Sequence, residues 1–344
     1  MVESNEIMSF NSHRRFGAEF EFCSFDNRDF KKYPLHEGEL PEGIHDVASI
    51  LMERLKVQVI VNKWHHTHNN EAWVLKPDSS AGIEMCSPVV KGWQGIKHVC
   101  RAIDAIQVEP KIKVDDRCGF HLHVEVSDCN NEEIGSILAH WIKCESVFLD
   151  SVPLKRKRNK YCQQIGLCPF FAHDENVDAY WLIDKLGEMK YYTINTFHLI
   201  KNKRRTIEFR IAEGEGCLDQ YLIKNWSRLL LHFVERAKML PLPGKYNPSN
   251  PWSGYLWLDL KDVMNLMGFD GSLSKGLEET RNWFLARIAE NIRTNIDGLW
   301  SEEARQITQK QLLELVDTYQ IKDLNHFLRP KDMRSAVYAP DTII

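Results

Sequence analysis

The sequence lacks the features of membrane and secreted proteins and of the common nucleotide-binding loops. No apolar run approaches the ~20 residues that a membrane-spanning helix needs. The opening stretch MVESNEIMSFNSHRR has no apolar core of a secretion signal. Neither GxxxxGK[ST] nor GxGxxG occurs, which disfavours P-loop and Rossmann chemistry. We therefore expect a cytoplasmic protein with no membrane partner.

Paired cysteines and an excess of positive charge are also missing. The nine cysteines are an odd number and include no CxxC pair, which favours reduced thiols over a disulfide framework. The net charge of −4 gives no strong nucleic-acid signal. With 344 residues, 43% hydrophobic and 27% charged, the chain can form one large or two ordinary globular domains.

Apolar periodicity predicts a mostly antiparallel sheet with helices on one side. The predicted strands cover residues 14–25, 57–61, 71–77, 81–90, 118–126 and 204–214. The predicted helices cover residues 43–56, 93–106, 128–152, 218–238, 274–296 and 301–319. The segments 57–61 and 71–77 look like a strand pair around a polar hairpin tip. Its histidines, His65, His66 and His68, could also suggest zinc, but no acidic or cysteine partner stands at ligand spacing.

The domain organisation follows from one change in composition. Residues 241–254 are rich in Pro, Gly and Asn and are expected to form a linker. Residues 1–240 would then form the first and larger domain. Residues 255–344 would form a helical C-terminal section that packs on it, because its helices carry apolar stripes.

Four predicted strands share an unusual alternation. Each has one apolar side that suits a core, while the other side carries Glu, His or Arg. The polar sides carry Glu19 and Glu21, Glu84, His121 and His123, and Glu208 and Arg210. An ordinary antiparallel sheet with one wet face also alternates, but such faces favour Thr, Lys, Ser and Gln. Two like charges on one strand, as in EFE, are tolerable when a cation lies over them.

Carboxylates with one or two imidazoles are suitable ligands for Mg²⁺ or Mn²⁺. An Arg two residues from a Glu on the same face suits phosphate held beside a metal ion. The cysteines Cys86, Cys118 and Cys162 flank these segments. They are read as small buried residues rather than nucleophiles.

The motifs GAEFEF, DSSAGIEMCSP, CGFHLHV, KYC and TIEFR, in this order, resemble the carboxylate–amine ligases related to glutamine synthetase, in particular the putative amidoligase family. The resemblance spans roughly residues 15–215. It implies an α+β fold with a curved antiparallel sheet that forms half a barrel, with helices on the convex side. It also implies that the concave polar face holds metal and nucleotide ligands.

The resemblance assigns metal ligands position by position. Glu19, His121 and Glu208 are similar to the ligands of the ion that bridges the transferring phosphate. Glu21 and Glu84 resemble ligands of the ion nearer the substrates. The implied ions are Mg²⁺ or Mn²⁺.

It also assigns groups that act on ATP. Arg210 resembles the phosphate-binding arginine, and His123 occupies the place of a second histidine near nucleotide or phosphate. Arg158 and Lys160 resemble a basic loop over the nucleotide phosphates, although a solvated loop or another partner fits this run too. Asn195 matches a family Asn before the last strand, where a turn residue is the alternative.

The implied reaction is ATP-dependent amide formation: ATP phosphorylates a carboxylate, and an amine attacks the acyl phosphate. The amine and carboxylate could belong to small molecules, peptides or proteins, and a homo-oligomer stays open. Two other functions remain open as well. His-x-His with Glu also suits a metal-dependent hydrolase or a cupin-type enzyme. A ligase-like fold could also serve as an inactive binding protein.

Overall fold

The computed structural model describes most of the chain from residue 10 to residue 320. The described residues are 10, 12–25, 28–29, 40–41, 43–63, 71–78, 80–107, 112–167, 178–200, 205–214, 218–242, 257–296 and 302–320. None of the helices in these ranges is long and apolar enough to cross a membrane.

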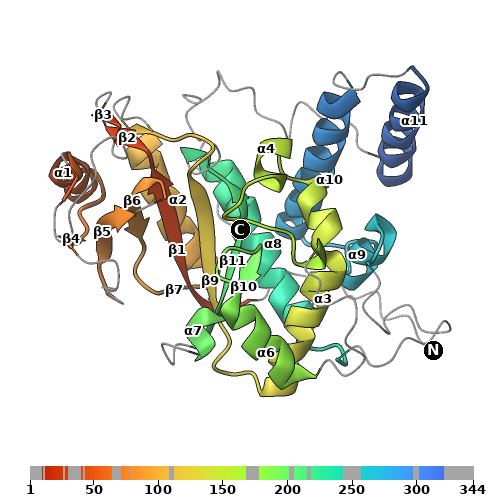
Figure 1. Ribbon diagram of the computed structural model, residues 1–344, viewed down its shortest axis with the longest axis horizontal. Coiled ribbons are helices and arrows are strands. Elements are labelled where there is room, and N and C mark those ends of the chain that lie inside the picture. The colour runs from red at the N-terminus through yellow and green to blue at the C-terminus, as the bar shows by residue number, and fades with distance from the viewer. Residues whose placement is uncertain are drawn as a thin grey trace.

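An eight-stranded sheet organises the fold, in the order β10-β11-β9-β1-β6-β5-β4 with β7 paired to β1 (Figure 1). Its strands are β1 (Arg15–Phe22), β4 (Val59–Val61), β5 (Trp73–Asp78), β6 (Gly82–Cys86), β7 (Val90–Lys91), β9 (Gly119–Glu125), β10 (Ile194–Asn195) and β11 (Thr206–Glu213). The short strands β2 (Ser24–Phe25), β3 (Arg28–Asp29) and β8 (Ile112–Lys113) form a second sheet. Within the described ranges the edge strands β10 and β4 do not pair with each other, so the large sheet is open. The predicted α+β class is confirmed.

One strand pair differs from the prediction. β4 and β5 run parallel, with Val59 opposite Trp73 and Val61 opposite Leu75, whereas a hairpin would make them antiparallel. A parallel pair needs a crossover between its strands rather than a tight turn. Apolar runs carry no direction, so the sequence pattern could not distinguish the two arrangements. The histidines of the expected hairpin tip lie within residues 64–70, outside the described part.

The helices follow the predicted segments and add four that periodicity did not identify. Their bounds are α1 (Ile44–Leu55), α2 (Gly92–Gln107), α3 (Asn131–Asp150), α4 (Leu154–Lys157), α6 (Ala179–Glu188), α7 (Phe197–Ile200), α8 (Gln220–Ala237), α9 (Leu260–Leu266), α10 (Lys275–Ile296) and α11 (Glu302–Tyr319). The additional helices are α4, α6, α7 and α9. Helix α3 begins with a capping box, in which the side chains of Asn130 and Glu133 each accept the other residue's backbone N–H.

Helices α2, α3 and α8 cover the apolar side of the sheet, and Figure 1 shows them gathered there. Phe20 of β1 contacts Phe120 of β9, with ring centroids 5.2 Å apart. The ring of Trp141 on α3 lies 4.9 Å from Phe209 of β11 and 5.5 Å from Phe233 of α8. This aromatic contact fixes β11, and with it the polar residues on the opposite face.

The C-terminal helices extend the same apolar core. Trp283 on α10 packs against Trp226 of α8, with ring centroids 5.3 Å apart. Phe284 lies 5.5 Å from Phe148 of α3. Helix α11 follows on the far side of α10 (Figure 1). The predicted linker lies mostly outside the described residues, so the division into two domains stays a prediction.

Two buried histidines should make the fold sensitive to acid. His140 and His232 are buried, and burial lowers the pKa of each to about 4. The unfolded chain, with a histidine pKa near 6.5, binds more protons between these values, so the free energy of unfolding falls as the pH falls from about 6.5 to about 4. Each histidine contributes roughly 3 kcal/mol to this loss.

His232→Gln tests this dependence, because Gln can still donate to the Met267 carbonyl that His232 Nε2 contacts at 2.9 Å. Urea unfolding measures the free energy of unfolding at pH 7 and at pH 4.5. The difference between these two values should be smaller for His232→Gln than for the wild type. The exposed His45 supplies the control His45→Gln, which should keep the wild-type difference. An equal difference in His232→Gln and the wild type would contradict the expectation.

Candidate active site

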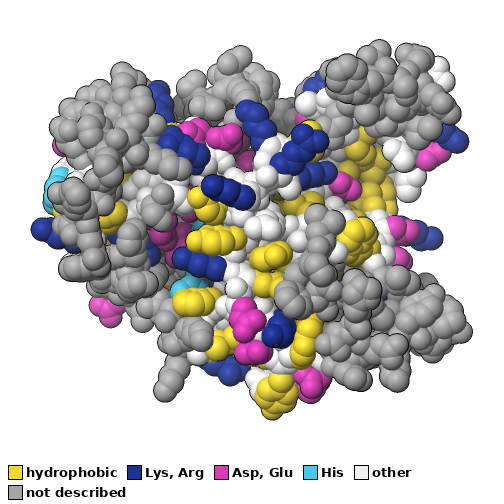
Figure 2. Space-filling view, in the orientation of Figure 1, with side chains coloured by type: hydrophobic (Ala, Val, Ile, Leu, Met, Phe, Trp, Pro, Cys, Tyr) yellow, Lys and Arg dark blue, Asp and Glu magenta, His cyan; other side chains and the backbone are white. Residues whose placement is uncertain are grey.

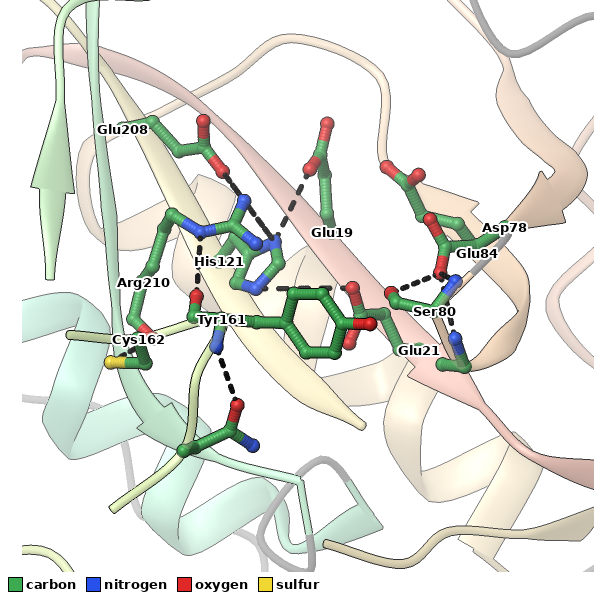
Figure 3. Close-up of polar contacts among 12 residues, drawn as sticks. Glu19, Glu21, Asp78, Ser80, Glu84, His121, Tyr161, Cys162, Glu208 and Arg210 are labelled. Atoms are coloured by element: carbon green, nitrogen blue, oxygen red, sulfur yellow. Dashed lines mark hydrogen bonds and ion pairs between the residues drawn. The ribbon is translucent and has the colours of Figure 1, made fainter. Parts of the chain in front are cut away.

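The polar face of the sheet carries the candidate site, as the alternation predicts. Strand pairing sets the register: Glu19 lies opposite His121, Glu208 lies opposite His123, and Glu21 lies opposite Glu84. The site therefore draws on four adjacent strands, β11, β9, β1 and β6. Figure 3 shows its side chains next to one another across these strands.

His121 lies at the centre of the cluster. Its Nδ1 is 3.5 Å from Glu19 Oε2 and 3.5 Å from Glu208 Oε1, and its Nε2 is 3.9 Å from Glu21 Oε1. Glu19, His121 and Glu208 each offer one ligand atom, and these three atoms lie within 4.8 Å of one another. The family resemblance implies that this same trio binds one metal ion.

Glu84 completes the set from β6. Its Oε1 lies 3.4 Å from Lys76 Nζ on the neighbouring strand β5. Glu84 also forms a second trio with Glu19 and Cys86, again with ligand atoms within 4.8 Å. All five predicted metal ligands therefore lie on one face, and their role as ligands stays a prediction.

Two of the carboxylates are buried without enough positive charge around them. Burial, with Asp78 as the next cause, raises the pKa of Glu21 well above its usual value. Burial and the neighbouring Glu19 raise the pKa of Glu84 to about 8, although Lys76 opposes the shift. A divalent cation between these groups would supply the missing charge. The donor set thus fits a metal ion.

The other half of the cluster holds its charges as ion pairs. Burial would raise the pKa of Glu208, but Arg210 and His123 outweigh it and bring the value to about 2. Burial also opposes ionisation of Glu19, yet the charge of His123 holds its pKa well below the usual value. For His123, burial is outweighed by Glu19 and Glu208, which raise its pKa to about 9. Burial and the positive Arg210 lower the pKa of His121 to about 4.

Arg210 and Asn195 hold Glu208 from both sides. The buried Arg210 guanidinium donates to Glu208 Oε1, and the Asn195 side-chain amide donates to Glu208 Oε2. Arg210 Nε also donates to the Tyr161 carbonyl at 3.4 Å. The prediction that these two residues belong to the site agrees with this geometry, although their contact with nucleotide stays a prediction.

The basic run is arranged differently from the expectation of a loop. Residues 154–157 form helix α4, and its Arg156 points inward. Arg156 donates to the carbonyls of Arg210 and Ile211 and so holds β11 where its register shifts. Arg158 is exposed, as is Lys160.

Arg158 and Lys160 instead line an open hollow of about 260 Å³ beside the cluster. Its other lining residues include Arg117, Lys155 and one carboxylate, Asp116. Figure 2 shows Lys and Arg side chains gathered over the upper centre of this face, where α4 lies. The hollow suits an anionic group, and this agrees with a phosphate contact without establishing it.

Sequence reasoning missed three residues of the site. Lys76 follows the alternation of β5, and this signal could have placed it on the polar face. Arg156 could not be distinguished from its basic neighbours without knowing how α4 turns. His198 lies on the short helix α7, whose four residues show no periodicity, and its ring centroid is 5.1 Å from that of His123.

The three cysteines near the site are buried, as predicted. Cys86, Cys118 and Cys162 have relative exposures of 5%, 0% and 0%. Cys86 Sγ donates to Glu84 Oε1 at 3.2 Å. Burial raises the pKa of Cys86 well above its usual value, which disfavours a nucleophilic role.

Three comparisons with known proteins add to this geometry. A search of curated proteins gives no match. Among solved structures, the chain is similar to a bifunctional glutathione synthetase from Pasteurella multocida, with a TM-score of 0.40 and 10% sequence identity. That match covers 89% of this chain, and the chain spans about half (52%) of the length of that protein.

A family model described as "Putative amidoligase enzyme" matches residues 12–168. The matched segment contains Glu19, Glu21, Glu84 and both histidines of β9, while Glu208 and Arg210 follow it. Strand pairing brings these two later residues against the matched strands. The predicted resemblance to the putative amidoligase family is thereby confirmed over residues 12–168.

Proposed function

We propose that the chain is an ATP-dependent carboxylate–amine ligase that forms an amide through an acyl phosphate. The observation that carries the proposal is the convergence of four carboxylates, two imidazoles and Arg210 on one sheet face, most of them within the segment that matches the family. The sheet would then correspond to the curved half-barrel of glutamine synthetase-like enzymes, with its polar face concave.

The metal-binding residues divide into two groups. Glu19, His121 and Glu208 would hold one Mg²⁺ or Mn²⁺ ion, and Glu21 with Glu84 would hold another. Such ions supply positive charge that neutralises the phosphates of ATP. The raised pKa values of Glu21 and Glu84 support the second group, because a bound cation would favour the ionised form of both buried carboxylates.

The protein's own cations would act on the phosphoryl group. Arg210 is buried, with a relative exposure of 9%, and forms an ion pair with Glu208. Its positive charge would stabilise the negative charge that develops on the transferring phosphate. His123 would lie near the same phosphate. Arg158 and Lys160 would approach from the hollow beside α4, and Asn195 would fix the orientation of Glu208.

The reaction balances in two steps. An oxygen of the substrate carboxylate attacks the γ-phosphorus of ATP, which breaks the bond to ADP and forms the acyl phosphate. The amine nitrogen then attacks the acyl carbon, loses a proton and displaces inorganic phosphate. The carboxylate oxygen that bonded to phosphorus therefore leaves with the phosphate.

Labelling the substrate carboxylate with ¹⁸O tests this proposal. With ATP, Mg²⁺ and a panel of amines and labelled carboxylates, we expect ADP and a phosphate that carries one label, measured by mass spectrometry. Label-free phosphate, or AMP with pyrophosphate, would refute the acyl-phosphate mechanism. Nucleotide binding without turnover would instead support an inactive binding protein.

The same experiment separates the ligase from a metal-dependent hydrolase. A hydrolase would release products without consuming ATP. It would also give the buried Arg210 no phosphate to bind, although its guanidinium lies within the cluster. We propose a cytoplasmic location too, which the free thiols of the described cysteines support.

A further inference from the structure

His198 adds a third imidazole to the site, and none of the sequence motifs contains it. The residue lies on α7, and its ring meets that of His123 edge-on, at an angle of 62°. His123, His198 and Glu208 each offer one ligand atom, and these three atoms lie within 4.8 Å of one another. A trio of two imidazoles and one carboxylate is thus assembled beside the Glu19, His121 and Glu208 trio.

A second observation at His123 points to a ligand. Its Nε2 atom is buried between two carboxylate oxygens, Glu19 Oε2 at 3.1 Å and Glu208 Oε1 at 4.0 Å. The contact with Glu19 is an ion pair without well-aligned hydrogen-bond geometry, so the same two oxygens that pair with a protonated His123 could instead share a bound cation with it. Buried polar atoms are almost always satisfied, and an imidazole nitrogen between carboxylates can be satisfied by a cation.

The position of α7 is coupled to Glu208 through one side chain. Asn195 Oδ1 accepts the backbone N–H of Phe197 at 3.0 Å, at the first residue of α7. The amide nitrogen of the same Asn195 donates to Glu208 Oε2. Asn195 therefore fixes His198 and Glu208 relative to each other, which is how a rigid ligand set is built.

The donor types decide which cation suits this trio. Mg²⁺ prefers oxygen ligands and keeps several waters, whereas imidazole nitrogen suits first-row transition metals such as Zn²⁺; Mn²⁺ is the transition metal whose ligand preference is nearest to that of Mg²⁺, so it makes the strictest probe. From these contacts we infer that His123, His198 and Glu208 form a cation site that selects an imidazole-accepting divalent ion over Mg²⁺. The inference deepens the proposed function, and it rests on that function because it names the class of cation that the same site takes.

Removing His198 tests the site by binding rather than by activity. Titration calorimetry of the full chain with Mn²⁺, and separately with Mg²⁺, would compare the wild type with His198→Ala. The Mn²⁺ affinity should fall at least about tenfold on loss of one ligand. The Mg²⁺ affinity should change by less than about twofold, because Mg²⁺ is held by oxygen ligands. His45→Ala, which removes an exposed histidine of α1, should leave both affinities unchanged.

His198→Asp provides a second test if the Ala variant does not fold. An oxygen ligand at this position should bind Mg²⁺ more tightly than the wild type does and reduce the preference for Mn²⁺. The inference would be overturned if His198→Ala kept the wild-type Mn²⁺ affinity or lost affinity equally for both ions. It would also be overturned if His198→Asp kept the wild-type preference for Mn²⁺ over Mg²⁺. A wild type that selects Mn²⁺ through His198 but never cleaves ATP would refute the proposed function and leave this site standing.

Discussion

Replacing Glu19 with Gln is expected to lower the rate of ATP-dependent amide formation at least about 100-fold, the typical cost of removing one group that stabilises transition-state charge. Glu19 belongs to two ligand trios, one with His121 and Glu208 and one with Glu84 and Cys86. Gln is nearly isosteric but neutral, so it keeps the packing and loses the charge. The rate of ADP formation with the substrates found by the isotope experiment measures the effect.

The matched control for this variant is Glu125→Gln. Glu125 lies on the same face of β9, but at its end, where it pairs with the exposed Arg15. An ion pair with such an exposed partner contributes little to stability, and Glu125 belongs to none of the ligand trios among the described residues, so this variant should retain the wild-type rate. A Glu19→Gln protein with the wild-type rate and the wild-type melting temperature would exclude Glu19 from the chemistry.

Arg210→Ala is expected to reduce turnover by about 100-fold or more, because it removes a fixed positive charge from the place where phosphate charge develops. It also leaves Glu208 without its buried ion-pair partner, and breaking such a pair costs roughly 3–5 kcal/mol of stability. Arg210→Lys separates the two effects. It keeps a charge beside Glu208 and should restore most of the stability, but it lacks the planar fork that binds phosphate in two places.

The turnover of Arg210→Lys should therefore stay well below that of the wild type. Its melting temperature, in contrast, should be close to the wild-type value. The exposed Arg158 gives the comparison: Arg158→Ala should leave stability unchanged and lower the rate less than Arg210→Ala does. If Arg210→Lys recovers both properties together, Arg210 stabilises the fold and does not act on phosphate.

The sequence by itself determined which residues face the site within each strand. Strand geometry alternates side chains strictly, so GAEFEF and CGFHLHV fix Glu19, Glu21, His121 and His123 on polar sides wherever those strands lie. The apolar partners in the same strands fix the buried side for the same reason. The α+β class and the main helices follow from periodicity alone.

Only the tertiary structure decided which strands are neighbours and which polar groups meet. The pairing of β11 with β9 brings Glu208 to His121 across 87 residues of sequence, a contact that no local pattern contains. The parallel direction of β4 and β5 could not be predicted either, because an apolar segment does not indicate in which direction its strand runs relative to a neighbour.

The same limit applies to Arg156 and His198. Each enters the site because a short helix turns it inward, and a helix of four residues is too short to leave a periodic signal. Local sequence patterns thus identified the candidate residues. Tertiary packing determined which of these residues meet, because the contacts that position them join segments far apart in the chain.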